Sequence, residues 1–395
     1  MDNVPGYVIM VLNTLGSNGF EASLVGGCLR DTLLDRPVND WDVATSALAP
    51  DVMRIFPKTV KTGARYGTVA VITGGGAVEV TTYRRDGRYS DGRRPDRVSF
   101  VSDLQEDLKR RDFTINAMAM TLDGKLVDPF DGREDLKRRV IRCVGDPAER
   151  FSEDALRMFR ALRFSAQLGF DIEEGTMAAM RKCARLCASL SVERIRDETE
   201  KILLSEKPER VGTALSFGLF KGRFENGELD SEKLRQLAGL PKLALFRWSA
   251  FCALMAGENL IASPEAFLKS MRLDAKTVRL CAAGIKAAQT ALPDGRIDVK
   301  RLLAALSGDA VLCAAAAEKA LRNTEKLQTI EEIMASGECY SVRELAVSGD
   351  DLIERGLKNG VKIGKTLETL LQHVIEHPED NKRACLLDLA LEMRD

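Results

Sequence analysis

The chain has 395 residues, of which 45% are hydrophobic and 30% are charged, and its formal net charge is −1. This length and composition predict a soluble globular protein of two to four domains. No apolar run reaches the roughly 18 residues that a membrane-spanning helix needs. The near-neutral charge excludes a general attraction to nucleic acids, so a nucleic-acid partner must be bound by local basic patches.

Nine cysteines, an odd number, are scattered along the chain without paired spacing. This distribution predicts reduced thiols, most of them small residues of the hydrophobic core, rather than a disulfide framework. The N-terminus lacks the basic and then apolar pattern of an export signal. We therefore expect a cytoplasmic protein that is not attached to a membrane.

Short β-rich runs alternate with helical patterns through residues 1–145, which predicts a mixed β-sheet with helices. The expected strands are residues 22–26, 40–45, 68–73, 77–83, 114–121 and 125–128. Residues 73–76, Thr-Gly-Gly-Gly, separate two of these runs and predict a hairpin turn. A nucleotide-binding glycine loop is the alternative, but no Lys-Ser/Thr pair follows and no helix begins there.

From residue 146 onward the β-pattern ends, and amphipathic helices follow that are separated by short Gly/Pro turns. The expected helices include residues 152–168, 175–187, 191–204, 208–217, 231–238, 242–255 and 264–271. The predicted fold class is therefore α+β, with an N-terminal head built on a mixed sheet and an all-helical remainder.

The first chemical motif is Val-Gly-Gly-Cys-Leu-Arg-Asp at residues 25–31, which predicts a strand that enters a helix through two glycines. Such a turn lets a phosphate approach the backbone closely, and the helix N-terminus favours its negative charge. Asp40 and Asp42 follow on an extended segment, where both carboxylates point to one side and can hold Mg²⁺. Trp41 is expected to face the core. Together these features predict a site that binds a nucleoside triphosphate and activates a nucleophile.

Glu79 is the candidate for a third carboxylate at this site. Strand alternation puts Glu79, Thr81 and Tyr83 on one face. A charge on an inner strand is costly unless it is paired or lies near a metal ion. The alternative is a solvent-facing edge position, where charged residues are common.

The order of these motifs resembles the DNA polymerase β nucleotidyltransferase superfamily, and within it the bacterial class II tRNA nucleotidyltransferases, the CCA-adding enzymes. Residues 110–117, Arg-Arg-Asp-Phe-Thr-Ile-Asn-Ala, are similar to the second signature of that family, which contacts the ribose and phosphates. The resemblance implies that Arg111 binds a phosphate or the sugar edge. Asp112 and Asn116 suit the recognition of hydroxyl groups. The resemblance also implies nucleotide-binding roles at the triphosphate for Gly27 and Arg30.

Residues 153–164 carry a Glu-Asp-x-x-Arg motif on the predicted helix 152–168. Asp154 and Arg157 together have the hydrogen-bond code for cytosine and adenine, because the carboxylate accepts from an exocyclic amine and the guanidinium donates to a ring nitrogen. Guanine and uracil place a carbonyl and an N–H group at these positions. The alternative is an ordinary surface ion pair, worth well under about 1 kcal/mol.

The CCA-adding enzymes have this motif, and in that family it is the protein template for CTP and ATP. The resemblance implies that Asp154 and Arg157 read the base, that Glu153 steadies Arg157, and that Arg160 and Arg163 line the same nucleotide pocket. Residues 191–198 are expected to brace this helix, and an ordinary exposed helix start explains them nearly as well.

Six arginines lie between residues 84 and 97, at positions 84, 85, 88, 93, 94 and 97. Charge patterning alone is compatible with a solvated loop. Residues 86–95 resemble the flexible loop that class II enzymes use when they switch from C to A addition. Relatives that add only CC lack this loop, so its presence favours complete CCA synthesis.

The resemblance implies a nucleotidyltransferase head at residues 1–145, a neck with base-recognition helices at 146–205, a body at 206–330 and a tail at 331–395. Body and tail would bind tRNA through its backbone phosphates. The implied activity is template-independent addition of CCA to the 3′ end of tRNA, including repair of incomplete ends. CTP and ATP would be the substrates, Mg²⁺ the cofactor and pyrophosphate the product, with Asp40, Asp42 and Glu79 as catalytic residues.

Several alternatives remain open at this point. A poly(A) polymerase, or a partial CC- or A-adding enzyme, shares the same motifs. A catalytically silent RNA-binding protein would require loss of the carboxylates, but Asp40, Asp42 and the Gly-Gly turn are intact. The sequence does not fix the oligomeric state, and a homodimer is one candidate.

Overall fold

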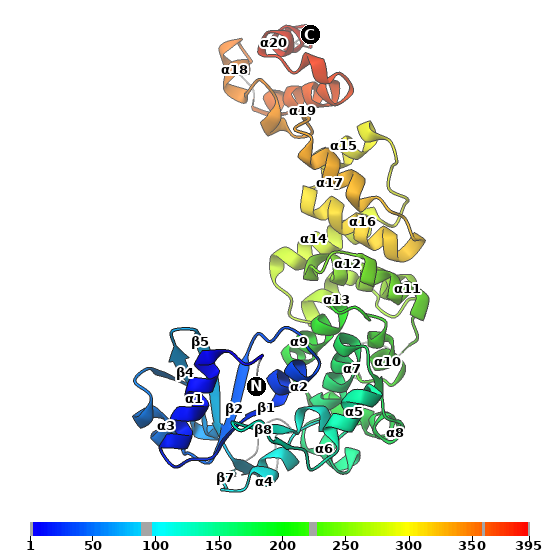
Figure 1. The fold of residues 1–395 in the computed structure, drawn as a ribbon. Coiled ribbons are helices and arrows are strands. Elements are labelled where there is room, and N and C mark those ends of the chain that lie inside the picture. Colours follow the sequence, from blue (N-terminus) through cyan, green and yellow to red (C-terminus); the bar gives the residue numbers. More distant parts are fainter. Residues whose placement is uncertain (1–2, 88–96, 221–226, 358–359, 394–395) are drawn as a thin grey trace. The chain divides into compact units, whose positions relative to one another are not determined.

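A computed structural model describes residues 3–87, 97–220, 227–357 and 360–393 (Figure 1). The chain divides into two compact units. The first comprises Met1–Ile202 and Thr213–Asn226, and the second comprises Leu203–Gly212 and Gly227–Asp395.

The first unit contains a seven-stranded sheet in the order β3-β4-β5-β2-β1-β8-β9. Its strands are β1 (Ala22–Val25), β2 (Trp41–Thr45), β3 (Thr59–Gly63), β4 (Thr68–Thr73), β5 (Gly76–Thr82), β8 (Ala119–Thr121) and β9 (Leu126–Val127). Neighbouring strands are antiparallel, except that β2 and β5 are parallel. The predicted hairpin turn is confirmed, because Thr73 pairs with Gly76 where β4 turns into β5.

One face of this sheet is covered by α1 (Gly6–Ser17) and α3 (Ala49–Ile55) (Figure 1). Val11 and Leu15 of α1 pack against strand residues such as Val43, and all three are fully buried. Trp41 is buried in the same core, as predicted. Because side chains alternate along a strand, the neighbouring Asp42 points to the other face of the sheet.

In the part of the first unit that the structure describes, nine further helices and 3₁₀ turns surround the sheet or follow it. They are α2 (Gly26–Leu33), η1 (Ala64–Tyr66), α4 (Leu104–Lys109), η2 (Thr114–Asn116), α5 (Gly132–Arg138), α6 (Pro147–Glu153), α7 (Leu156–Leu168), α8 (Glu174–Cys183) and η3 (Ala184–Ser189). Helix α9 (Val192–Leu203) ends at the boundary of the unit, and α10 (Arg210–Ser216) crosses that boundary.

The sequence prediction was wrong in part of the sheet. Residues 114–121 were expected to form one strand, but they begin as η2 and become a strand only at β8. The predictions also missed β3 and two small sheets, β6 (Arg84–Asp86) with β7 (Val98–Phe100) and β10 (Val140–Ile141) with β11 (Asp171–Ile172). Strands of two or three residues are too short to show a periodic pattern, so only their pairing partners define them.

The predicted helix 152–168 is interrupted at Asp154. Helix α6 ends at Glu153 and α7 begins at Leu156, and Asp154 between them is extended, with φ −147° and ψ 103°. The Asp154 carboxylate accepts a hydrogen bond of 3.0 Å from the backbone N–H of Leu156. This is the bond by which an aspartate starts a helix, so Asp154 acts as a break between two helices instead of a helical residue.

The second unit is helical throughout its described part. Its helices are α11 (Ser231–Gln236), η4 (Leu237–Gly239), α12 (Ala244–Gly257), α13 (Pro264–Ser270), α14 (Ala275–Ala287), α15 (Arg296–Ala305), α16 (Gly308–Arg322), α17 (Leu327–Ala335), η5 (Val342–Glu344), α18 (Gly349–Glu354), α19 (Gly360–Glu376), η6 (Pro378–Asp380) and α20 (Arg383–Glu392). Arg247 of α12 is fully buried, and its guanidinium donates to the carbonyls of Leu203, Ala238, Leu240 and Pro241. These acceptors satisfy a charged group that burial alone would make costly.

All nine cysteines are free, and seven of them are buried, in agreement with their predicted role as reduced core residues. Among the described helices, none combines the length and the apolar character that crossing a membrane would require.

Gly132, at the start of α5, packs closely against the segment around η2. A Cβ atom at this position would lie 2.2 Å from the backbone carbonyl oxygen of Thr114, which has little freedom to move. We expect Gly132→Ala to destabilise the protein by about 1–3 kcal/mol. Gly16→Ala in α1 is the control, because a Cβ there meets nothing within 4 Å. Equal melting temperatures for the two variants would contradict the inferred packing.

Candidate active site

A cavity of about 980 Å³ lies on the face of the sheet opposite to α1 and α3. Asp42 of β2, Glu79 of β5 and Thr68 of β4 line it from three adjacent strands. The structure brings eleven of the predicted site residues to this cavity: Gly27, Arg30, Asp42, Glu79, Arg111, Asp112, Asn116, Asp154, Arg157, Arg160 and Arg163. Asp40 is exposed and is not among the lining residues.

The Gly-Gly turn forms one edge of the cavity, where β1 passes directly into α2. Gly26 has a φ of +71°, which glycine adopts without strain. A Cβ atom at this position would lie 3.2 Å from the Arg111 Nη1 and 3.4 Å from the Asp42 Oδ2. Gly26 therefore leaves room for the Arg111 guanidinium and the Asp42 carboxylate. Sequence reasoning named only Gly27, although Gly26 has the stronger steric requirement.

Asp42 and Glu79 face each other across the parallel pair β2 and β5. The pKa of Asp42 is raised to about 6, mainly by burial and also by the negative charges of Glu79 and Asp40, whereas Arg111 opposes the shift. The alternative of a solvent-facing edge position for Glu79 is wrong about the edge, because β5 is an interior strand, but the Glu79 side chain is exposed. Carboxylates that repel one another in this way fit a divalent cation, which would relieve the repulsion.

The fit to a metal ion is incomplete in one respect. Within residues 3–87, 97–220, 227–357 and 360–393, no three His, Cys, Asp or Glu side chains are grouped closely enough to hold a metal ion. Asp42 and Glu79 therefore offer two protein ligands on the cavity wall.

A chain of hydrogen bonds fixes the cationic side of the cavity. Arg30 Nη1 donates to the Asn116 Oδ1 at 2.9 Å, and the Asn116 amide donates to Asp112 at 3.2 Å. Arg160 Nε donates to the other oxygen of Asp112 at 2.8 Å. Although burial alone would raise it, the charge and hydrogen bonds of Arg160 lower the pKa of Asp112 to about 2. Asp112 and Asn116 thus hold two arginines, and their recognition of sugar hydroxyls stays a prediction.

Phe164 is a residue that sequence reasoning did not select. The guanidinium carbons of Arg30, Arg160 and Arg163 lie 5.1, 5.3 and 4.3 Å from the centre of its ring. Cations favour the face of an aromatic ring, so Phe164 lets three of them gather. Burial and the charge of Arg160 lower the pKa of Arg163 to about 10. Such a concentration of positive charge suits the binding of phosphate groups.

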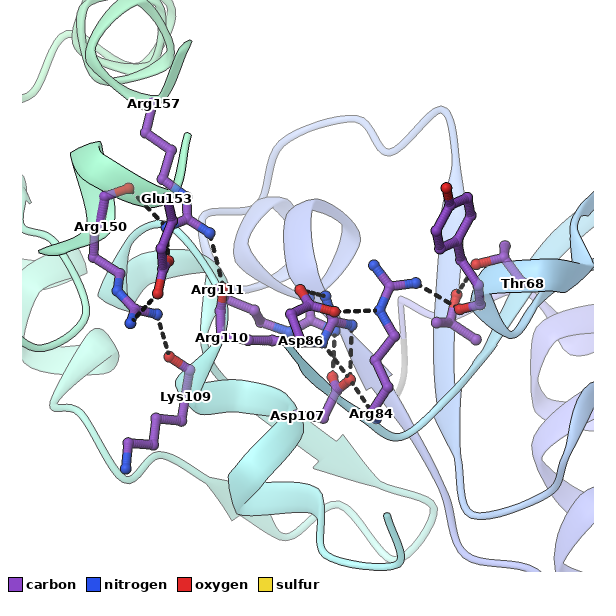
Figure 2. A network of polar contacts seen from close by, with 12 residues as sticks. Thr68, Arg84, Asp86, Asp107, Lys109, Arg110, Arg111, Arg150, Glu153 and Arg157 are labelled. Carbon is purple, nitrogen blue, oxygen red and sulfur yellow. Dashed lines mark hydrogen bonds and ion pairs between the residues drawn. The ribbon is translucent and has the colours of Figure 1, made fainter. Parts of the chain in front are cut away.

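Arg157 is held by the protein around it and is only 7% exposed (Figure 2). Its Nη1 donates to Glu153 and to the Arg150 carbonyl at 2.9 Å, and its Nη2 donates to the Arg110 carbonyl at 3.2 Å. The predicted contact between Glu153 and Arg157 is therefore present. Because Arg157 is buried, an ordinary surface ion pair does not describe this residue.

Asp154 is fixed by Arg194 of α9. Arg194 donates to both carboxylate oxygens, at 3.1 and 2.7 Å. The segment 191–198 was expected to brace the helix, and its contact is with the Asp154 carboxylate itself. A bidentate pair of this kind sets the orientation of a carboxylate. The orientation of the Asp154 carboxylate is therefore set by Arg194.

Asp107 is the buried carboxylate that joins Arg110 and Arg111 in the polar network of Figure 2. Its side chain is 1% exposed and accepts hydrogen bonds from Arg110, at 2.7 and 2.9 Å, and from Arg111 at 3.1 Å. Arg111 is thereby held close to Asp42, whose charge it partly offsets. Asp107 was not predicted, although its spacing of three and four residues from Arg110 and Arg111, directly after α4, was a usable signal.

The predicted flexible loop lies largely outside the described residues, since 88–96 are not described. Its flanks are described, and they pair as β6 and β7. Arg84 Nη1 donates to the Tyr66 carbonyl, and Arg84 Nε donates to Asp86 at 3.0 Å.

Comparison with known proteins gives three matching family models. They are the Poly A polymerase head domain at residues 22–142, the "Probable RNA and SrmB- binding site of polymerase A" at 169–227, and domain 2 of tRNA nucleotidyltransferases at 246–390. The CCA-adding enzyme of Limosilactobacillus fermentum is 40% identical over 392 residues, which cover 97% of this chain and 96% of that protein. This chain belongs to the CCA-adding enzymes.

Further relatives agree with this assignment. The CCA-adding enzyme of a Geobacillus species is 39% identical, with 94% of this chain and 93% of that protein covered. The crystal structure of the Bacillus stearothermophilus CCA-adding enzyme in complex with CTP superposes with a TM-score of 0.82 at 34% identity, covering 98% of this chain and 96% of that chain. The family consists of nucleotidyltransferases that add CCA to tRNA, so the predicted class of enzyme and the predicted α+β fold are confirmed.

The raised pKa of Asp42 leads to a prediction about stability and pH. The pKa of Asp42 is about 6 in the folded protein and 3.8 ordinarily. Ionisation of Asp42 therefore destabilises the folded protein. This destabilisation is absent below about pH 4, grows as the pH rises and is complete above about pH 6. In EDTA, Asp42→Asn should therefore raise the melting temperature at pH 8 and leave it unchanged at pH 3.5. Thermal unfolding of both proteins across this range is the measurement. A gain of equal size at both pH values would contradict the raised pKa.

Proposed function

We propose that the cavity binds CTP and then ATP and transfers their nucleotides one at a time to the 3′ end of tRNA, including incomplete ends. The carrying observation is that Asp154 and Arg157 line the same cavity as Asp42 and Glu79. A base-reading pair and a phosphate-activating pair must face one substrate for a protein to select a nucleotide without a nucleic-acid template. The CTP complex of the Bacillus stearothermophilus relative supports CTP as a ligand.

Nucleotide selection rests on the chemistry of two side chains in this proposal. The carboxylate of Asp154 accepts from the exocyclic amine of cytosine or adenine, and Arg157 donates to the adjacent ring nitrogen. Arg194 and Glu153 hold the two groups in place before the nucleotide arrives. Guanine and uracil would leave both groups without a matching partner, which costs binding energy inside a cavity.

The triphosphate is proposed to lie between the Gly-Gly turn and the arginines. Gly27 brings the backbone of α2 close to a phosphate, and Arg30, Arg111, Arg160 and Arg163 supply positive charge. Mg²⁺ is the proposed cofactor, with Asp42 and Glu79 as ligands on the cavity wall and Asp40 as a further candidate. When bound, such an ion lowers the pKa of a hydroxyl and neutralises phosphate charge.

The proposed reaction forms one bond and breaks one. The 3′-hydroxyl oxygen of the RNA attacks the α-phosphorus, the hydroxyl proton leaves toward the carboxylates, and pyrophosphate departs on the opposite side. No covalent enzyme intermediate is required. Asp42 and the surrounding arginines contribute alignment and charge compensation, which dominate catalysis of phosphoryl transfer.

The division into head (1–145), neck (146–205), body (206–330) and tail (331–395) is part of this proposal. The head and neck would carry the chemistry, while the body and tail would bind tRNA phosphates without reading its sequence. A cytoplasmic location is part of this proposal, because tRNA is the proposed substrate. A homodimer stays an expectation, for which light scattering of the purified protein is the measurement.

The decisive experiment is incorporation into tRNA that lacks its CCA end. We expect two C residues with CTP alone, no A with ATP alone on this substrate, and complete CCA with both. Asp42→Ala should reduce incorporation at least a thousandfold and leave tRNA affinity within about twofold, because charge compensation at the reacting phosphate is lost. An unlimited run of A would instead identify a poly(A) polymerase, and a stop after CC with both nucleotides would identify a partial enzyme.

The template role of Asp154 predicts a change in nucleotide choice. Asp154→Ala should lower the preference for CTP over UTP by about 10- to 100-fold, since one matched contact is worth about 1–3 kcal/mol of discrimination. Competition between the nucleotides in the incorporation assay measures this ratio. Glu149→Ala, at an exposed position of α6 outside the cavity, is the matched control. Undiminished preference in Asp154→Ala would exclude the template role.

A further inference from the structure

One wall of the cavity has no part in the proposed function so far. It is formed by β3 and η1, where Thr62, Gly63, Ala64, Arg65 and Tyr66 line the cavity. This wall contains no residue that was predicted for catalysis or nucleotide binding. It is nevertheless continuous with the strands that carry Glu79 and Asp42.

The order of the strands locates this wall relative to the reacting groups. In the sheet, β3 and β4 lie on one side of β5 and β2, while β1 and the Gly-Gly turn lie on the other side. Glu79 and Asp42 therefore separate the η1 wall from the wall of Gly27 and Arg30. The two walls face the carboxylates from opposite directions.

The geometry of phosphoryl transfer assigns a different substrate to each wall. The attacking and leaving oxygens lie roughly in line on opposite sides of the α-phosphorus. If pyrophosphate leaves toward Gly27 and Arg30, the attacking 3′-hydroxyl must arrive from the direction of β4 and η1. This step rests on the proposed function, because it takes the triphosphate position from it.

We propose that Arg65 and Tyr66 form the binding subsite for the 3′-terminal nucleotides of the RNA substrate. Single-stranded RNA is bound by cationic groups that follow its phosphates and by aromatic rings on which its bases stack. Arg65 is exposed, Tyr66 is half-buried, and the Arg65 guanidinium carbon lies 5.9 Å from the centre of the Tyr66 ring. The pair thus presents one phosphate-binding group and one stacking surface beside the carboxylates.

The backbone around this subsite is held in place before RNA binds. Gly67 has a φ of +84°, and a Cβ there would lie 2.8 Å from a ring carbon of Phe100. Arg84 donates to the Tyr66 carbonyl, and the hydroxyls of Thr68 and Thr81 are hydrogen-bonded at 3.1 Å (Figure 2). A rigid support lowers the entropy cost of ordering an RNA end on Arg65 and Tyr66.

The test compares RNA and nucleotide binding in the full-length enzyme. Arg65→Ala and Tyr66→Ala should each raise the KM for tRNA lacking CCA by about tenfold, the effect of losing one phosphate or stacking contact. The dissociation constant of CTP, titrated with Mg²⁺ in the absence of RNA, should stay within twofold. Tyr66→Phe keeps the ring and should behave like the parent enzyme. Arg54→Ala, an exposed arginine outside the cavity, is the charge-matched control.

Each other outcome overturns the subsite. Weaker CTP binding with an unchanged KM for RNA would assign this wall to the nucleotide, and equal changes in both would mean a general structural effect. An unchanged KM for RNA in Arg65→Ala excludes the subsite even if Tyr66→Ala fails to fold, because Arg65 is exposed. Absence of incorporation by the unmodified enzyme would instead refute the proposed function.

Discussion

Converging like charges are the constraint on which the site depends. Arginines from five separate segments of the chain line one cavity, on whose wall Asp42 lies beside Glu79. Neither the arginines nor the two carboxylates would be stable without opposite charges nearby, because like charges at close range in a partly buried site repel strongly. The protein resolves this by pairing most of the arginines with buried carboxylates and by leaving the Asp42 carboxyl with a raised pKa, which a cation would lower.

The compensating carboxylates also provide rigidity. Asp107 holds Arg110 and Arg111, Asp112 holds Arg160, and Glu198 holds Arg163. Each pair orients a guanidinium that would otherwise sample many rotamers, so the cationic wall is arranged before a triphosphate arrives. The arginines proposed to contact the substrate are therefore held by the carboxylates of Asp107, Asp112 and Glu198. Sequence motifs draw attention to these arginines and pass over Asp107.

The two residues proposed to read the base are held in different ways. Arg157 is fixed by Glu153 and by the carbonyls of Arg110 and Arg150. Asp154 is fixed by Arg194 of α9. The break between α6 and α7 is what separates them, since a continuous helix would have placed Asp154 and Arg157 on one helical face. The break lets Asp154 be positioned independently of the helix that carries Arg157.

Spacing along the chain was enough to predict several local elements: the strand–Gly-Gly–helix turn, the hairpin at residues 73–76 and the amphipathic helices. The parallel pairing of β5 with β2, which puts Glu79 beside Asp42, came only from the folded chain. The same is true of the contact between Asp154 and Arg194, 40 residues away. Periodicity reports the neighbours of a residue along the chain. Which strands pair, and which arginine binds a given carboxylate, depend on packing between distant segments. Local sequence carries no signal for this packing.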